Sequence, residues 1–216
     1  IIETIKNLTV SGIENYSNTV KHWIETQDHT DVSDEKKTAL IKMFDNSKVA
    51  LIYGAAGTGK TTLINYISTY ISTVFTDYSR LYLAHTNPAV NNLKRKISAS
   101  SKCDFITITK FNNPYAKDIK RDYDILIIDE CSTVNNQDMR ELLRLAKYKL
   151  LILVGDIYQI EAIEFGNWFN AVRFFIPETS VCELTVPFRT ESKQLLGLWE
   201  NVRKMQGDIN DSDVLD

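Results

Sequence analysis

The chain has few cysteines, and their spacing suits neither crosslinks nor a zinc site. Only Cys103, Cys131 and Cys182 occur among its 216 residues, and no two of them form a C-x-x-C pair. An odd number at wide spacing argues against a disulfide framework and against zinc. We therefore expect a protein of a reducing, cytoplasmic setting.

The sequence also lacks a long apolar segment and an excess of positive charge. No apolar run approaches the ~20 residues that cross a bilayer, and no signal peptide is recognisable, so we expect no membrane partner. The formal net charge is −3, which leaves only a local patch for any nucleic-acid contact. The chain begins at Ile1, which fits either an excised piece of a longer protein or the removal of a tag.

One glycine-rich stretch matches G-x-x-x-x-G-K-[ST], the phosphate-binding loop called Walker A. Its residues are Gly54, Ala55, Ala56, Gly57, Thr58, Gly59, Lys60, Thr61 and Thr62. We expect the three glycines to adopt positive φ angles, so that successive N–H groups point inward and surround a phosphate. Lys60 can reach β- and γ-phosphates, and the Thr61 hydroxyl can ligate Mg²⁺.

The flanks of this loop support the motif. The apolar run Val49–Tyr53 predicts a buried strand before it. Apolar residues at helical spacing follow from Leu63 to Ile71 and predict a helix whose N-terminus adds positive charge. The alternative, a glycine-rich turn with a surface lysine, is disfavoured by this order of strand, loop and helix.

A second candidate element is the pair Asp129-Glu130, which follows the apolar run Ile125–Ile128. In the Walker B arrangement Asp129 would hold Mg²⁺ through water, and Glu130 would orient and deprotonate the attacking water. The alternative is that both carboxylates only solvate a strand end. We disfavour it because a phosphate loop lies in the same chain.

Two further polar residues are candidates at later strand ends. Gln159 follows the strand predicted at 150–154, and its amide can contact both a γ-phosphate and a water. Arg189 follows the strand predicted at 181–184 and could act as an arginine finger. A polar turn and a surface arginine are the alternatives.

Strands and helices alternate along the chain, which predicts an α/β fold with a parallel central sheet flanked by helices. The predicted strands are 49–53, 80–87, 104–109, 125–128, 150–154 and 181–184. Helices are predicted from Ser33 as N-cap, after the phosphate loop, from Pro88, from Asn135 as N-cap, and over 168–175. Residues 1–32 are expected to form an N-terminal helical extension and linker.

The motifs resemble those of superfamily 1 helicases, and within them the RecD-like branch. They stand in the family's order: motif I at 54–61, motif Ia at 84–89, a DNA-contacting motif at 107–111, motif II at 129–132, motif III at 155–160 and motif IV at 184–189. The resemblance covers roughly residues 33 to 190. It implies a RecA-like P-loop NTPase domain that hydrolyses ATP with Mg²⁺ and moves along single-stranded nucleic acid.

The resemblance also implies residue roles. Gln159 would couple the γ-phosphate to nucleic-acid contacts, and Arg189 would be a finger. Nucleic-acid contacts are expected from Thr86, Asn87, Thr109, Lys110, Phe111 and Trp168. Lys36 stands where the family has an adenine-reading glutamine, which leaves base selectivity open. Motifs V and VI are absent, so residues 191–216 are expected to lead toward a second RecA-like domain outside this chain, and the chain alone to hydrolyse slowly.

A local basic segment supports the nucleic-acid interpretation. Between Pro88 and Arg121 eight residues are basic and two acidic, a net charge of +6, with Phe111 and Tyr115 interleaved. A cationic groove with aromatic rings suits single strands, whether DNA or RNA. The alternative is a solvated helix face with the aromatic rings in the core.

Other P-loop functions remain as alternatives. A GTPase would carry an Asn-Lys-x-Asp guanine reader, and a nucleotide kinase an arginine-rich lid; neither is recognisable in the sequence. A non-catalytic nucleotide switch is disfavoured because Lys60, Thr61, Asp129 and Glu130 are all present.

Overall fold

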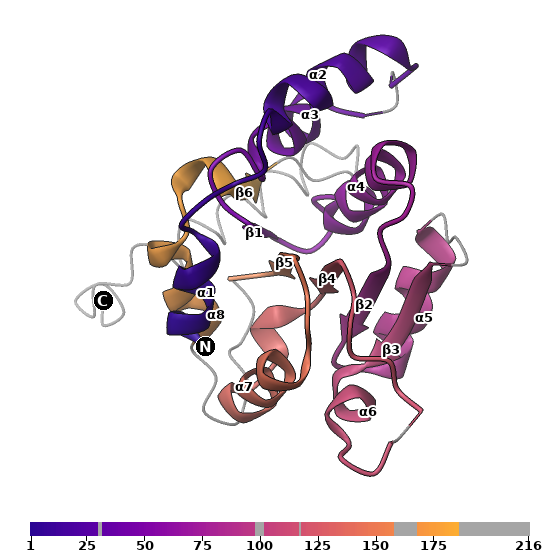
Figure 1. Cartoon of the computed structure of the whole chain (residues 1–216), viewed down its shortest axis with the longest axis vertical. Helices are drawn as coiled ribbons and strands as arrows, with labels where there is room; N and C mark the ends of the chain where they lie inside the picture. Colours follow the sequence, from indigo (N-terminus) through magenta and orange to yellow (C-terminus); the bar gives the residue numbers. More distant parts are fainter. Residues whose placement is uncertain (30–31, 98–101, 117, 158–167, 186–216) are drawn as a thin grey trace, which may run out of the picture.

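The computed structural model describes residues 1–29, 32–97, 102–116, 118–157 and 168–185. Its centre is a six-stranded parallel sheet in the order β3-β2-β4-β5-β1-β6 (Figure 1). The strands are β1 (Val49–Gly54), β2 (Arg80–Ala84), β3 (Cys103–Thr107), β4 (Ile125–Ile128), β5 (Leu150–Gly155) and β6 (Val181–Leu184). The predicted α/β fold with a parallel sheet is confirmed.

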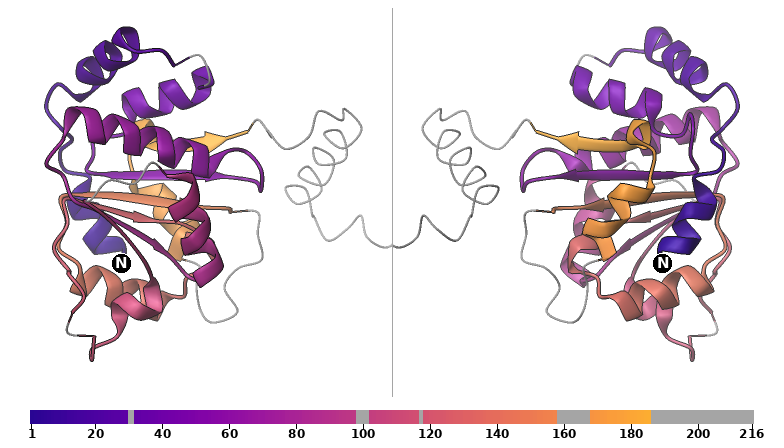
Figure 2. Two further views of the ribbon diagram at one scale, coloured as in Figure 1. Left: turned by 90° about the vertical axis from the view of Figure 1, so that its right-hand side faces the viewer. Right: turned by 90° about the vertical axis from the view of Figure 1, so that its left-hand side faces the viewer.

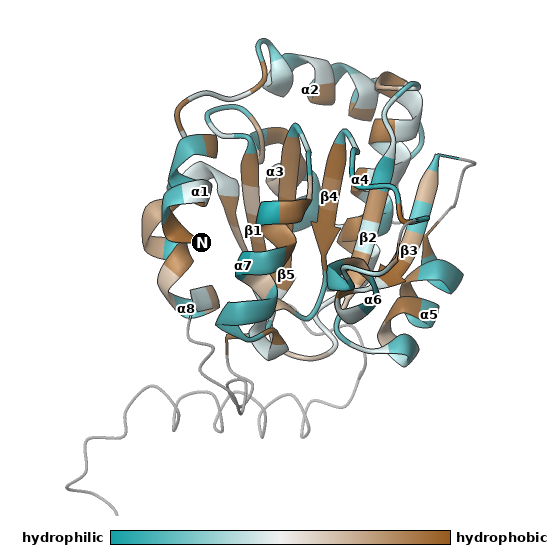
Figure 3. Ribbon diagram, turned by 60° about the horizontal axis from the view of Figure 1, so that its bottom comes forward, coloured by the Kyte–Doolittle hydropathy of each residue, from teal (hydrophilic) through white to brown (hydrophobic). Residues whose placement is uncertain are grey.

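The continuous apolar runs of the central strands follow from burial on both faces. In β1, Ala50 and Ile52 belong to one hydrophobic cluster, whereas Val49 and Leu51 belong to the other. β4 and β5 alternate in the same way, so the apolar colour extends along whole strands in Figure 3. Each fully buried aliphatic side chain contributes roughly 1.5–3 kcal/mol.

Helices cover both faces of the sheet, as the side views of Figure 2 show. The first cluster is covered by α2 (Tyr16–Thr26), α3 (Asp34–Lys42), α4 (Lys60–Val74) and α5 (Asn87–Lys96). The second is covered by α1 (Ile2–Leu8), α6 (Ile108–Asn112), α7 (Asn136–Leu145) and α8 (Trp168–Val172). None of the described helices is long and apolar enough to cross a membrane.

The N-terminal residues join these two cores. α1, which the sequence pattern did not predict, buries Ile5 in the second cluster and lies beside α8 (Figure 1). α2 buries Tyr16, Val20 and Trp23 in the first cluster, against α3 and α4. The predicted extension therefore contributes to the same cores as the sheet.

Three local predictions need correction. The strand expected at 104–109 ends at Thr107, because the Thr107 hydroxyl accepts a hydrogen bond from Lys110 N (3.2 Å) and begins α6. The helix expected at 168–175 is α-helical only to Val172 and continues as a 3₁₀ turn. Ser33 precedes α3 as predicted, but its hydroxyl accepts from Lys36 Nζ rather than from a backbone N–H.

The register of the sheet brings the candidate residues together at the carboxyl ends of the strands. Leu83 of β2 pairs with Ile128 of β4, and Ala84 pairs with Thr107 of β3. Tyr53 of β1 pairs with Gly155 of β5. The carboxyl ends of these five strands therefore lie side by side, where ligands bind in open parallel sheets.

Candidate functional site

The phosphate loop has the backbone that its motif requires at two of its three glycines. Gly57 has φ 88° and Gly59 has φ 86°, in the left-handed region that favours glycine. Gly54 does not have a positive φ, so the prediction is wrong there. Glycine is needed at position 54 for close packing instead, because a Cβ there would lie 2.4 Å from Leu184 O and 2.7 Å from Thr58 Oγ1.

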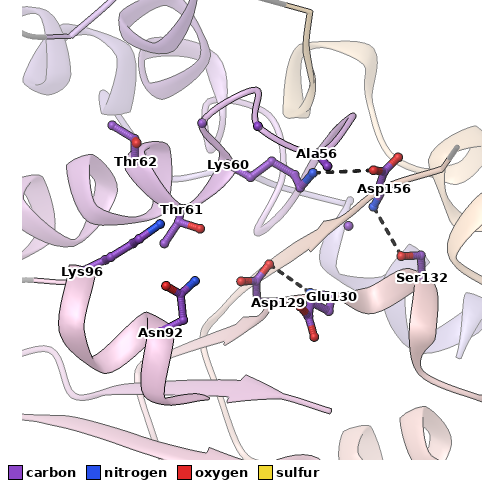
Figure 4. Close-up of a pocket in the computed structure, with 13 residues that line it drawn as sticks. Ala56, Lys60, Thr61, Thr62, Asn92, Lys96, Asp129, Glu130, Ser132 and Asp156 are labelled. Carbon is purple, nitrogen blue, oxygen red and sulfur yellow. Dashed lines mark hydrogen bonds and ion pairs between the residues drawn. The ribbon is translucent and has the colours of Figure 1, made fainter. Parts of the chain in front are cut away.

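Lys60 is the first residue of α4 and is held inside the loop. Its Nζ donates hydrogen bonds to Gly54 O and to Ala55 O (3.0 Å). It also lies 4.0 Å from Asp156 Oδ2 (Figure 4). The ammonium group is therefore positioned at the start of a fifteen-residue helix, where backbone N–H groups and the helix dipole favour an anion.

A cavity of about 320 Å³ opens beside this loop. It collects residues from the ends of β1, β4 and β5 and from α5: Ala56, Gly57, Gly59, Lys60, Thr61, Thr62, Asn92, Lys96, Asp129, Glu130, Ser132, Gly155 and Asp156. Thr61, Asp129 and Glu130 of the two predicted motifs thus face one space with Lys60. Thr58 belongs to the loop but does not line the cavity, and its hydroxyl donates to Ala55 O (2.9 Å).

Asp129 is a buried carboxylate of the cavity, with 8% of its surface exposed. The pKa of its carboxyl is raised from 3.8 to about 6, chiefly by burial and in smaller part by the neighbouring Glu130 charge. A hydrogen bond from Glu130 N to Asp129 Oδ1 (2.9 Å) and the charges of Lys60 and Lys96 act in the opposite direction on this pKa. A buried carboxylate beside cations and a hydroxyl is suited to binding a divalent cation.

Glu130 has an unusual backbone conformation for a residue with a side chain. Its φ is 58° and its ψ is 35°, and a short 3₁₀ turn begins after it. The turn is fixed by two hydrogen bonds from Thr133, whose N–H and hydroxyl both donate to Glu130 O. Such strain is common where a side chain must be aimed at a site, and here Glu130 lines the cavity and stays exposed.

The residues present fit a magnesium–nucleotide complex. Two positive-φ glycines open the loop, and Gly54 leaves no room for a Cβ. Lys60 and the start of α4 supply positive charge, whereas Thr61 and Asp129 supply the oxygen ligands that Mg²⁺ prefers. Lys60, Thr61 and Asp129 would hold the complex.

The cavity also contains residues that the sequence did not assign. Asn92 and Lys96 lie one turn apart on α5, on the flank next to its apolar face. Their spacing alone could not show that this flank faces the phosphate loop. Asp156 follows β5, and its N–H donates to Ser132 Oγ (3.4 Å), which ties the ends of β4 and β5 together.

The predicted nucleic-acid contacts divide into two groups. Thr86, Asn87, Thr109 and Lys110 are exposed at the ends of β2 and β3. Thr86 also caps α5 by accepting from Ala89 N (3.3 Å). These four residues lie at the carboxyl ends of the strands, as the cavity does. β2 is next to β4 in the sheet, and β3 is next to β2.

The two predicted aromatic contacts lie in the core. Phe111, on α6, is 0% exposed and packs in the second cluster, and Trp168 is 5% exposed with its Nε1 donating to Val134 O (2.7 Å). Neither ring can stack on a base in this conformation, so we do not retain them as contacts. Tyr115, by contrast, is 88% exposed directly after α6. Gln159 and Arg189 lie outside the described residues.

Lys36, at the position of the family's adenine-reading glutamine, is buried. Its Nζ donates to Ser33 Oγ (3.2 Å), and burial lowers the pKa of this ammonium group. The next residue toward the N-terminus, Glu35, accepts hydrogen bonds from Thr185 N and Oγ1, which follow β6. This part of α3 is therefore fixed against the end of β6.

Comparisons with known proteins identify the family and the fold of this chain. The AAA domain family designated AAA_30 matches residues 31–212. An uncharacterized protein of Methanocaldococcus jannaschii is 28% identical over 81% of this chain and 17% of its own length. A probable conjugal transfer protein TraA of Sinorhizobium fredii is 27% identical over 67% of this chain and 13% of its own length. The chain thus spans less than a fifth of either relative.

Solved structures share the fold. A Pif1 helicase from Bacteroides, in complex with ADP-AlF3 and single-stranded DNA, superimposes with a TM-score of 0.54 at 19% identity. The match covers 83% of this chain and 47% of that one. The chain belongs to the AAA domain family designated AAA_30, and its RecA-like fold is similar to that of the Pif1 helicase.

Proposed function

We propose that this chain is the first RecA-like motor domain of an ATP-dependent helicase or translocase that moves along single-stranded DNA. The observation that carries the proposal is the cavity that unites Lys60, Thr61, Asp129 and Glu130. RNA is the alternative track. The RecD-like branch within superfamily 1 is part of the proposal.

The phosphate loop and four side chains of the cavity have separate tasks. The loop N–H groups and Lys60 bind the phosphates of ATP, and Thr61 and Asp129 hold Mg²⁺. When bound, Mg²⁺ neutralises charge that develops on the phosphates. The Glu130 carboxylate accepts a proton from the attacking water, and the αL backbone of Glu130 aims its side chain into the cavity.

The nucleic-acid track crosses the ends of β2 and β3. Thr86 and Asn87 open α5, whereas Thr109 and Lys110 open α6, so two helix N-termini and one ammonium group face the phosphates of the strand. Tyr115 extends this track with an exposed ring for base stacking. Arg121 fixes the loop, because its Nη2 donates to Asn113 O (3.1 Å).

A second RecA-like domain completes the motor in this proposal. ATP would lie between the two domains, with Gln159 and Arg189 contacting its γ-phosphate. The short span of this chain within its relatives supports a longer protein. We expect the chain alone to bind nucleotide weakly and to unwind nothing. We also expect weak discrimination between ATP and GTP, since buried Lys36 replaces the glutamine.

The test is Mg²⁺-dependent ATP hydrolysis by this chain with and without single-stranded DNA, beside Glu130→Gln. Loss of a general base lowers turnover by about 10²–10⁴-fold. The matched control is Glu141→Gln, an exposed glutamate paired with Arg144 on α7, which should hydrolyse like the wild type.

The outcomes separate motor from switch. Hydrolysis that DNA stimulates and that Glu130→Gln removes supports the motor domain. Nucleotide binding that depends on Lys60, without any hydrolysis here or beside a second domain, would favour a nucleotide switch instead. Hydrolysis that Glu130→Gln leaves unchanged would contradict the assigned general base.

A further inference from the structure

The nucleotide cavity has a second cationic wall that comes from α5. Lys96 and Asn92 line it from the side opposite Lys60 and Asp156, next to Thr61 and Asp129 (Figure 4). The two residues are spaced by four, so they share one flank of the helix. The buried residues Val90 and Leu93 anchor that helix to the sheet.

The charges of the cavity leave Lys96 available. Lys60 lies 4.0 Å from Asp156 and donates to two loop carbonyl groups. Lys96 forms no ion pair within the described part of the chain, and its side chain is exposed to the cavity. Its charge also acts on the buried Asp129 carboxyl, and an ammonium group that faces a phosphate site without a direct ion pair is suited to bind an anion there.

Lys96 lies beside Thr61 and Asp129, the two residues that would hold Mg²⁺. Thr61 and Asp129 mark the metal position, and Glu130 marks the position of the attacking water. The loop and Lys60 enclose the opposite side. A diphosphate can be held by the loop alone, whereas a third phosphate within reach of Lys60 would lie between Lys60 and the α5 wall.

We propose that Lys96, assisted by the Asn92 amide, contacts the terminal phosphate of a bound nucleoside triphosphate and makes the site distinguish triphosphate from diphosphate. The inference rests on the proposed function and adds a triphosphate-selective contact within this domain. Lys96 is a direct phosphate contact in this scheme, and Asn92 donates a second hydrogen bond beside it.

The experiment measures dissociation constants by calorimetry for Mg²⁺–ADP and for the Mg²⁺-bound β,γ-imido analogue of ATP. Lys96→Ala should weaken the triphosphate analogue by about tenfold and ADP by less than about twofold, because a hydrogen bond to a charged group is lost only with the triphosphate. Lys96→Arg should retain most of the selectivity. Asn92→Ala should reduce it by about threefold.

Lys94→Ala is the matched control. Lys94 is exposed in the same helical turn but lies on the other flank and does not line the cavity. It should bind both nucleotides like the wild type, and thermal melting of every variant should confirm an intact fold.

Failure of this inference differs from failure of the proposed function. If the wild type binds neither nucleotide, the proposed function fails and the inference falls with it. If the wild type binds both and Lys96→Ala weakens both equally, or neither, the inference alone is overturned. Equal losses in Lys96→Ala and Lys94→Ala would also overturn it, because they would report only net charge.

Discussion

Two groups of residues at the carboxyl ends of the strands differ in how many contacts fix their conformation. At the ends of β1, β4 and β5, the nucleotide half uses positive-φ glycines, a buried carboxylate and an anchored lysine. At the ends of β2 and β3, the nucleic-acid half is exposed and carries few fixed contacts. A site that binds one compact ligand is enclosed in advance, whereas a site for a sliding strand stays open.

The largest expected effect tests the reassignment of Phe111. Phe111→Ala removes a fully buried ring of α6 and should lower the free energy of unfolding by about 3–5 kcal/mol. Phe174→Ala, which removes a ring that is 73% exposed, should change it by less than about 0.5 kcal/mol. Urea denaturation measures both. A stable Phe111→Ala protein with weakened DNA binding would restore Phe111 as a contact.

Asp129→Asn, in the nucleotide half, should abolish hydrolysis and raise the stability of the protein. Because the folded pKa is raised from 3.8 to about 6, the wild-type carboxyl contributes stability below pH ~4 that is lost as the pH rises through 6. The amide avoids this loss and still accepts the Glu130 N–H. At pH 7 the variant should therefore be about 3 kcal/mol more stable than the wild type.

The stability difference should follow the pH in one direction. Denaturation curves of Asp129→Asn and the wild type should coincide near pH 4 and separate between pH 4 and 6. The charges of Glu130, Lys60 and Lys96 contribute to the pKa of Asp129 and so to the upper end of this range. Mg²⁺-dependent hydrolysis should be lost at every pH. A variant less stable than the wild type at pH 7 would show that burial does not dominate this pKa.

Tyr115 tests the nucleic-acid half directly. Tyr115→Ala should weaken binding of an oligothymidylate by about five- to tenfold, since stacking of one base contributes roughly 1–3 kcal/mol. Nucleotide affinity should not change. The control is Phe174→Ala, which removes an exposed ring far from the basic segment. Fluorescence anisotropy measures oligothymidylate binding by both variants. Equal binding by Tyr115→Ala and the wild type would remove this residue from the track.

Lys110 should give the smallest effect. Lys110→Ala should weaken single-stranded DNA binding about twofold to threefold and reduce the slope of log affinity against log salt by about one. Lys21→Ala, at an exposed position of α2, serves as the control and should leave the slope unchanged. An unaltered slope in Lys110→Ala would mean that this ammonium group contacts no phosphate.

The same division explains what the sequence could predict. Residues that a backbone conformation requires, such as Gly57 and Gly59, can be recognised in any chain, and apolar runs such as that of β4 predict buried parallel strands. Both helped to define the nucleotide half. Gly54 was recognised for the wrong reason, because close packing against Leu184 depends on a strand far away in sequence.

Side-chain direction was harder to predict. Phe111 and Tyr115 are four residues apart in the same basic segment, yet one is buried and the other exposed, because α6 begins where a strand was expected. Lys96 could not be assigned either, since the packing of α5 against the sheet decides which flank meets the cavity. The α1 helix was missed because only Ile5 is buried over its seven residues.

The most direct test of the account is whether the two halves act together. Single-stranded DNA affinity should be measured without nucleotide, with Mg²⁺–ADP and with the Mg²⁺-bound imido analogue of ATP, in the wild type and in Lys60→Ala. We predict that the triphosphate analogue changes DNA affinity at least fivefold in the wild type and not in Lys60→Ala, because coupled sites share a free energy. DNA affinity that is identical with every saturating nucleotide would contradict the account.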